Sequence, residues 1–126
     1  MTTFKTEFDA LTSKYPSEKD TIRRLKRWMA EELDSENVEH RVYSVDRLLS
    51  VIEPQSSWQF LKILGDLTND GLLKQFVRLH SESGTGLGDY ERFEDVPEKT
   101  LDITVDKEIE VTPDDLQVLY KFAVNE

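Results

Sequence analysis

Hydrophobic residues near the start of the chain recur at the three- and four-residue spacing of helices. One stripe is formed by Phe4, Phe8, Leu11 and Tyr15, and a second by Ile22, Leu25, Met29 and Leu33. The first stripe predicts a helix over residues 3–13, because Pro16 disfavours helical backbone at the residue before it. The second predicts a helix over residues 17–33, with Ser17 at the N-cap and Asp20 as its capping-box partner.

Two more helices are predicted further along the chain. The first covers residues 44–52, where Ser44 can act as the cap. The second covers residues 57–69 and ends before Gly71, a residue suited to the left-handed conformation that closes helices. Between the two helix pairs, residues 41–43 fit either a short strand or an extended connector. The N-terminal half is thus predicted to contain about four helices.

The pattern beyond these helices is that of strands. Residues 72–81 form a β-compatible run, and the glycine-rich residues 83–88 are predicted to be a flexible loop. Further along, four apolar residues all occupy odd-numbered positions: Ile103, Val105, Ile109 and Val111. A three-residue turn over 106–108 would place them on one face of a hairpin. Residues 117–124 alternate like a strand but also fit helical spacing, and we favour a strand preceded by a turn at Thr112. An α+β fold with a small antiparallel sheet in the C-terminal half is therefore predicted.

This order of elements resembles a winged helix-turn-helix domain. In this comparison residues 44–52 are the first helix of the pair and residues 53–55 are the turn. Residues 57–69 occupy the place of the recognition helix. The strands 72–81 and 117–124 would be the two sides of the wing. The resemblance rests on the order of elements and not on a diagnostic motif.

The resemblance covers about residues 41–124, and residues 1–40 precede it as two N-terminal helices of a single domain over 1–126. The family is built around DNA binding, although many members bind proteins. Two features of this chain depart from the DNA-binding pattern. The helix in the recognition place has one cation, Lys62, and the wing position is taken by an acidic insertion over 82–115. The resemblance to the winged-helix family therefore implies a protein-binding member.

Charge is unevenly distributed over the 126 residues, which carry a formal net charge of −10. Residues 1–63 hold ten basic and eleven acidic side chains, whereas residues 64–126 hold six and fifteen. Because phosphates attract clustered cations, this balance disfavours nucleic acid and anionic membranes as partners. The chain has no cysteine, which excludes disulfides and thiolate metal sites. We expect a cytoplasmic protein without a signal segment or a membrane span.

Three groups of residues are candidate binding surfaces. The basic group consists of Arg23, Arg24, Lys26 and Arg27, and the acidic group of Asp102, Asp106, Glu108 and Glu110. The basic group is a solvated helix face or a local phosphate patch. The acidic group is expected to form an outward ridge of the hairpin, either for recognition or as protection against aggregation. Trp28 and Trp58 lie beside the stripes of their helices, so they widen the core or, if exposed, anchor a protein interface.

The sequence offers no catalytic constellation. His40 and His80 have no metal-ligand spacing, and the acidic segment lacks the register of a calcium loop. We therefore expect no cofactor, metal or small-molecule substrate, and no enzyme. The leading hypothesis is a non-catalytic winged-helix-type module that binds a protein partner, or a second copy, through the acidic or Trp-bearing surface. The alternatives are a DNA-associated regulator that docks through Arg23 to Arg27, and a small acidic inhibitor or immunity-type protein.

Overall fold

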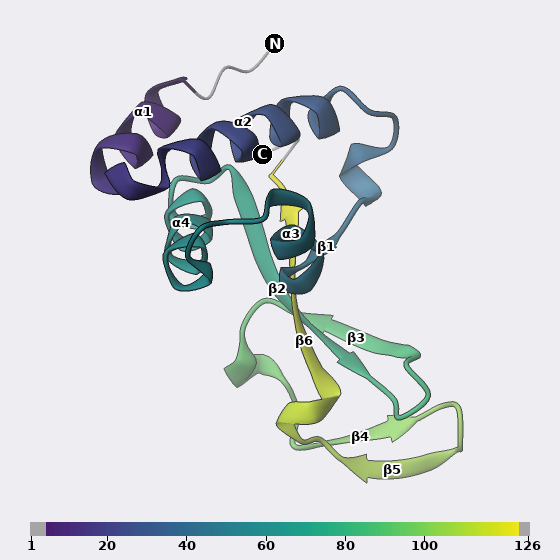
Figure 1. The fold of residues 1–126 in the computed structure, drawn as a ribbon. Helices are drawn as coiled ribbons and strands as arrows, with labels where there is room; N and C mark the ends of the chain where they lie inside the picture. The colour runs from purple at the N-terminus through teal and green to yellow at the C-terminus, as the bar shows by residue number, and fades with distance from the viewer. Residues whose placement is uncertain (1–4, 124–126) are drawn as a thin grey trace. The chain divides into compact units, whose positions relative to one another are not determined.

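The computed structural model describes residues 5–123, with helices in the N-terminal half and strands mainly in the C-terminal half (Figure 1). The helices are α1 (Lys5–Lys14), α2 (Lys19–Leu33), α3 (Val45–Ile52) and α4 (Ser57–Asn69). The strands are β1 (Tyr43–Ser44), β2 (Leu73–His80), β3 (Gly86–Tyr90), β4 (Lys99–Asp102), β5 (Lys107–Glu110) and β6 (Leu116–Phe122). The predicted α+β class is confirmed. Phe4 and Val124, which belong to the predicted first stripe and last strand, lie outside the described residues.

Serine side chains start α3 and α4. The Ser44 hydroxyl accepts a hydrogen bond from the Arg47 backbone N–H (3.1 Å), and the Ser56 hydroxyl accepts one from the Gln59 N–H (3.2 Å). The capping box predicted at Ser17 is wrong. Pro16–Glu18 form a separate 3₁₀ turn, and α2 begins only at Lys19 without a side-chain cap.

Four strands form one sheet in the order β1-β6-β2-β3, and β4 and β5 form a separate pair. The last segment is a strand, as we favoured from its alternation. The flexible loop predicted over 83–88 is wrong in part, because Gly86 begins β3 and Gly88 pairs with Leu79 of β2. Glycine is depleted in strands, so composition argued against β3. A bidentate pair between Arg78 and Asp89 (2.8 and 3.1 Å) joins the two strands.

The hairpin of β4 and β5 exists, but its predicted register is wrong. Thr100 pairs with Ile109 and Asp102 with Lys107, so the connection covers residues 103–106 instead of 106–108. The cause is local hydrogen bonding. The Asp102 carboxylate accepts bonds from the Thr104 N–H (2.9 Å) and the Thr104 hydroxyl, a turn that aspartate favours over regular strand. Asp106 completes the connection in the left-handed region, with φ 52°.

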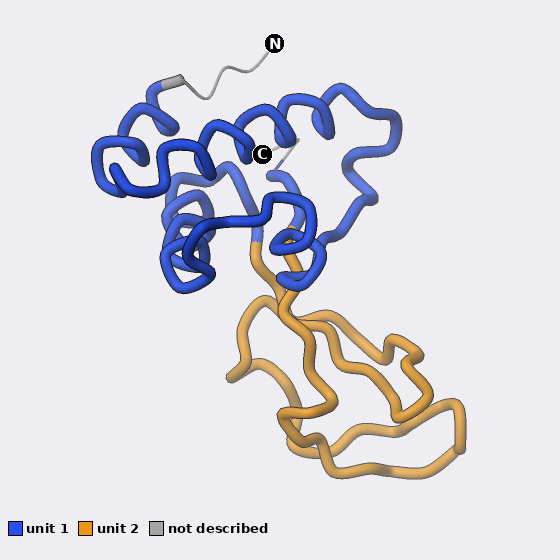
Figure 2. The backbone as a smooth tube through the Cα atoms, viewed as in Figure 1, with its two compact units in different colours: residues 1–74, 121–126 blue, residues 75–120 orange. Residues whose placement is uncertain are grey.

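The described residues fall into two compact units (Figure 2). The helical unit comprises the described residues up to Lys74 and from Lys121 onward, and the β unit comprises Gln75–Tyr120. In the helical unit, α1 and α3 both pack against α2, and α4 buries Phe60, Ile63, Leu64 and Leu67 completely. The β unit buries Val77, Leu79, Leu119 and Tyr120. The division into two compact units does not test the prediction that residues 1–126 form a single domain.

Candidate protein-interaction surfaces

Helix α4 has an apolar outer side as well as a buried one. Trp58 is 69% exposed and Leu61 is 39% exposed, although the other large apolar side chains of this helix are buried. The Lys62 ammonium lies 5.4 Å from the centre of the Trp58 ring, which is a cation–π distance. We call Trp58, Leu61 and Lys62 the α4 surface. A large aromatic ring presented to solvent beside a second apolar residue is typical of a protein-binding site.

The last residue of helix α1, Lys14, and the residue after it, Tyr15, both contact α4 at Asp66. The Tyr15 hydroxyl donates to Asp66 Oδ2 (2.8 Å), and the Lys14 ammonium donates to both carboxylate oxygens (3.2 and 3.0 Å). Burial alone would raise the pKa of Asp66, but the hydrogen bonds from Lys14 and Tyr15 together lower the pKa below its usual value. Burial, followed by the bond to Asp66, raises the pKa of Tyr15.

Helix α2 and the 3₁₀ turn that precedes it fix the connection between α3 and α4. The Thr21 hydroxyl accepts from the Gln55 N–H (3.4 Å), and the buried Glu18 carboxylate accepts from the Ser56 N–H (3.3 Å). On the same helix, the Arg24 guanidinium donates to the last carbonyls of α3, at residues 52 and 53 (2.9 Å each). These contacts satisfy backbone groups that a helix end leaves unpaired. The α4 surface is thus presented by a helix held at both its start and its middle.

Trp28, the second tryptophan candidate, belongs to an internal aromatic cluster. Its ring lies 4.9 Å from that of Tyr43 and 5.8 Å from that of Phe122, and both partners are buried. The Tyr43 hydroxyl donates to Glu32 (3.1 Å). Burial, then this hydrogen bond, raises the pKa of Tyr43 to about 12. Trp28 therefore holds β1 and β6 against α2, and Trp58 alone is presented to solvent.

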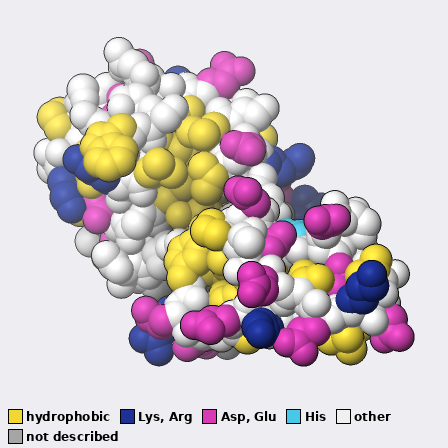
Figure 3. All heavy atoms as spheres, turned by 90° about the horizontal axis from the view of Figure 1, so that it is seen from below, with side chains coloured by type: hydrophobic (Ala, Val, Ile, Leu, Met, Phe, Trp, Pro, Cys, Tyr) yellow, Lys and Arg dark blue, Asp and Glu magenta, His cyan; other side chains and the backbone are white. Residues whose placement is uncertain are grey.

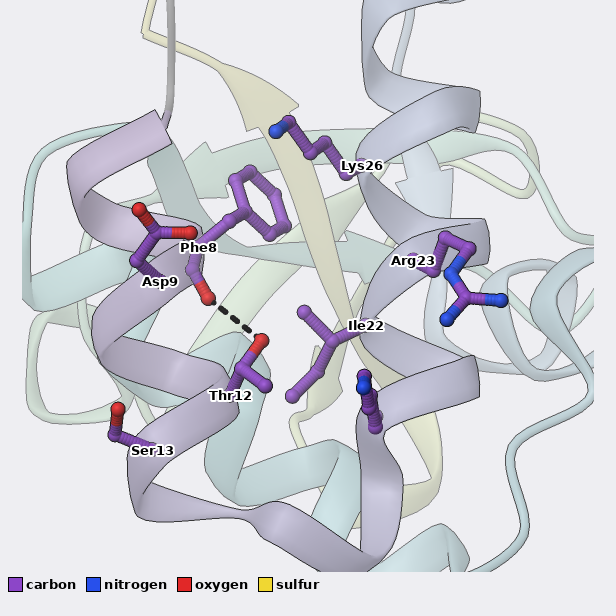
Figure 4. A pocket seen from close by; sticks show the side chains of 8 residues that line it. Phe8, Asp9, Thr12, Ser13, Ile22, Arg23 and Lys26 are labelled. Atoms are coloured by element: carbon purple, nitrogen blue, oxygen red, sulfur yellow. Dashed lines mark hydrogen bonds between the residues drawn. The ribbon is translucent and has the colours of Figure 1, made fainter.

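The predicted basic group divides between two roles. Arg24 is engaged with α3, as described above, whereas Arg23 and Lys26 join Lys19 along a pocket of about 460 Å³ between α1 and α2 (Figure 4). Phe8 and Ile22 line the same pocket. Figure 4 shows the Lys26 side chain extending toward the helix that carries Phe8. Arg27 is exposed and does not line this pocket.

The predicted acidic ridge is exposed at three of its four positions. Asp106, Glu108 and Glu110 are exposed, but Asp102, expected to point outward, is only 4% exposed. The register change explains this difference, because it turns Asp102 inward and leaves Ile103 and Val105 outside. On the face that Figure 3 draws, carboxylates are scattered among exposed hydrophobic side chains.

Asp102 also lines a pocket of the β unit together with Glu82, Glu110 and Asp115. Sequence reasoning did not select Glu82 or Asp115, because only the folded chain brings them to Asp102. Within residues 5–123, no cluster of His, Asp or Glu side chains could hold a metal ion.

None of the helices over residues 5–123 is long and apolar enough to span a membrane. The chain matches no protein-family model, no curated protein and no solved structure.

Proposed function

We propose that this protein is a non-catalytic, winged-helix-type module that binds another protein through the α4 surface. The observation that carries the proposal is Trp58, which is 69% exposed on the helix in the recognition place. The element order supports the winged-helix assignment, since α3 and α4 precede β2 and since β6 returns beside β2 as the second side of a wing would.

The chemistry of α4 favours a protein over DNA as the partner. Lys62 is the one Lys or Arg in the sequence of α4, and Asp66 lies one turn further along the helix. Phosphate and base contacts are made mainly by cationic and amide side chains, and α4 provides one cation, Lys62, with the amides Gln59 and Asn69. Burying the exposed part of a Trp ring, on the order of 150 Å², removes apolar surface from water worth at most about 4 kcal/mol before the costs of association are subtracted. The α4 surface thus offers more to an apolar partner than to a phosphate backbone.

Affinity capture from the native lysate, with and without nuclease, tests this proposal. The bait variants are the wild type, Trp58→Ala and the matched control Phe93→Ala, which removes an aromatic ring that is 55% exposed in the β unit. We expect one stoichiometric protein that survives nuclease, is lost with Trp58→Ala and is kept with Phe93→Ala. Capture that Trp58→Ala leaves intact would refute the α4 surface as the binding site.

The same experiment separates the alternative partners. If retention depends on intact nucleic acid, the partner is DNA or RNA, and the cations Lys19, Arg23 and Lys26 become the residues to replace. A partner that binds only at low salt, and that both bait variants retain, would indicate an electrostatic contact of the acidic inhibitor type. Either result would replace the proposed function.

A further inference from the structure

The pocket of about 460 Å³ between α1 and α2 has a basic lining in an acidic protein. Lys19, Arg23 and Lys26 of α2 line it, and Asp9 of α1 is the one acidic side chain among the lining residues. We call this site the α1–α2 groove. Its lining carries a net charge of +2, whereas the whole chain carries −10.

The cations of the α1–α2 groove are available to a ligand, because all three side chains are exposed. Among the residues that the structure describes, neither Lys19 nor Lys26 makes an ion pair or a hydrogen bond. Arg23 contacts Asp20 at 3.5 Å, but these two side chains are 62% and 78% exposed, so water screens the pair. The groove therefore presents positive charge that its described surroundings neutralise only weakly.

The three cations follow one side of α2. Their separations of four and then three residues place them on the same face of the helix. The rise of an α-helix spreads them over about 10 Å. Figure 4 shows Phe8 and Ile22 between the two helices, and both side chains are buried, so they offer a ligand little apolar surface. The groove therefore suits a narrow anionic ligand that is held by charge.

We propose that the α1–α2 groove binds a short, extended acidic segment of another protein. In an extended chain every second side chain lies on the same face, so three carboxylates at alternate positions span about 13 Å. The flexible stems of Lys19 and Lys26 accommodate the difference between this span and the row of cations. Because exposed charge pairs contribute little individually, the complex is weak and depends on salt.

The charge outside the groove favours a protein segment over a nucleic acid. The sequences of α1 and α2 together hold seven basic and five acidic side chains, a net charge of +2, which leaves −12 for the rest of the chain. A DNA duplex carries one negative charge per about 1.7 Å, so it would extend beyond the groove and be repelled by the remaining charge. A protein segment can confine its carboxylates to the groove and continue with neutral or basic residues. The groove shares no residue with the α4 surface, so each of the two proposals can fail alone.

NMR titration of the ¹⁵N-labelled full chain with a short peptide of alternating Glu and Ser residues tests the groove. The reporters are the backbone amide signals of Ser13 and Arg23, which line it from α1 and α2. We expect saturable shifts of these signals that weaken as salt is raised, and none with a peptide in which Gln replaces Glu. Lys19→Gln and Lys26→Gln should each weaken binding about two- to fivefold. Arg27→Gln removes a charge from an exposed residue of α2 outside the groove and should weaken binding by less than about 1.5-fold.

Several outcomes would overturn the proposal. Unchanged groove signals, or equal shifts with the Gln peptide, would mean that the groove does not recognise carboxylates. Equal weakening by Arg27→Gln and Lys26→Gln would assign the effect to the overall charge of α2. Tighter binding of a short oligothymidylate would make the groove a phosphate site, and shifts confined to the Trp58 and Leu61 amides would place the peptide on the α4 surface. Because Lys19 and Lys26 are exposed, their replacement leaves the core intact and keeps the test valid.

Discussion

The contact between α1 and α4 at Asp66 permits a quantitative test of the fold. Replacing Tyr15 by Phe removes one hydrogen bond, 2.8 Å long, from a nearly buried phenol to a carboxylate that is 24% exposed. Hydrogen bonds to charged groups contribute about 1.5–3 kcal/mol. We therefore expect Tyr15→Phe to lower the free energy of unfolding by about 2 kcal/mol at pH 7. Asp66→Asn keeps a neutral acceptor for the phenol and should cost about 1 kcal/mol.

The pH dependence of this contact has a defined sign. The pKa of Asp66 is lowered in the folded protein from its ordinary value of 3.8, so the unfolded chain takes up the proton first as the pH falls. The stabilisation by Asp66 is therefore present above pH 3.8 and is lost as the pH falls through the folded-state pKa. The stability difference between the wild type and Asp66→Asn should be constant from pH 7 to 5 and shrink toward pH 3.

Urea denaturation followed by circular dichroism measures these differences. The matched control is Thr6→Val, an exposed position on α1 away from Asp66, which should change stability by less than about 0.5 kcal/mol. The reasoning is refuted if Tyr15→Phe has no more effect than this control. It is also refuted if the difference between wild type and Asp66→Asn grows as the pH falls below 3.8.

Three further predictions concern other contacts. Arg24→Ala removes two bonds to the end of α3 and should cost about 1 kcal/mol in urea denaturation, whereas its exposed neighbour Arg23→Ala should cost less than half of that. The raised pKa of Tyr43, about 12, means that its stabilising effect is complete below pH 10 and is lost as the pH rises from about 10 to 12. Because the pKa values of Tyr15 and Tyr120 are raised as well, absorbance at 295 nm should show several late-titrating phenols, and Tyr43→Phe should remove the component that titrates near pH 12. Because Trp58 is exposed, iodide should strongly quench the tryptophan fluorescence of the wild type and of Trp28→Phe. The fluorescence of Trp58→Phe should be quenched only weakly. Stronger quenching of Trp58→Phe than of Trp28→Phe would contradict the exposures of the two side chains.

Local patterns predicted most of the helices and the final strand. Ser44 and Ser56 sit at the start of segments with apolar residues at helical spacing, and both act as caps. Such signals depend on neighbours within one turn, so they can be read from sequence. The register of the β4–β5 hairpin could not be predicted from local patterns. Hydrophobic alternation placed Ile103 and Val105 in one strand, whereas the chain turns at these residues because the Asp102 side chain accepts hydrogen bonds from Thr104. A side chain that competes with the strand ladder leaves no mark in hydrophobic alternation.

The candidate surfaces depended on contacts that are distant in sequence. Trp28 and Trp58 had equivalent positions beside their stripes, and only Phe122 and Tyr43, brought over Trp28 by the fold, distinguish the two. The pocket that Glu82 and Asp102 line in the β unit also depends on a distant contact, because strand β3 separates these two residues in the sequence. Sequence reasoning located the acidic region as a whole, but the folded chain decides which carboxylates face one pocket.

The division of the chain has a consequence for loop closure. The β unit is one continuous segment of 46 residues, and the strands of the helical unit that flank it are adjacent, since the Ala123 N–H donates to the Leu72 carbonyl (3.1 Å). The entropy of closing a loop grows only logarithmically with its length. Shortening 46 residues to a four-residue turn would therefore recover only about 2 kcal/mol of closure entropy. In terms of closure entropy, a helical unit with these neighbouring ends therefore tolerates insertions of very different length at the same point.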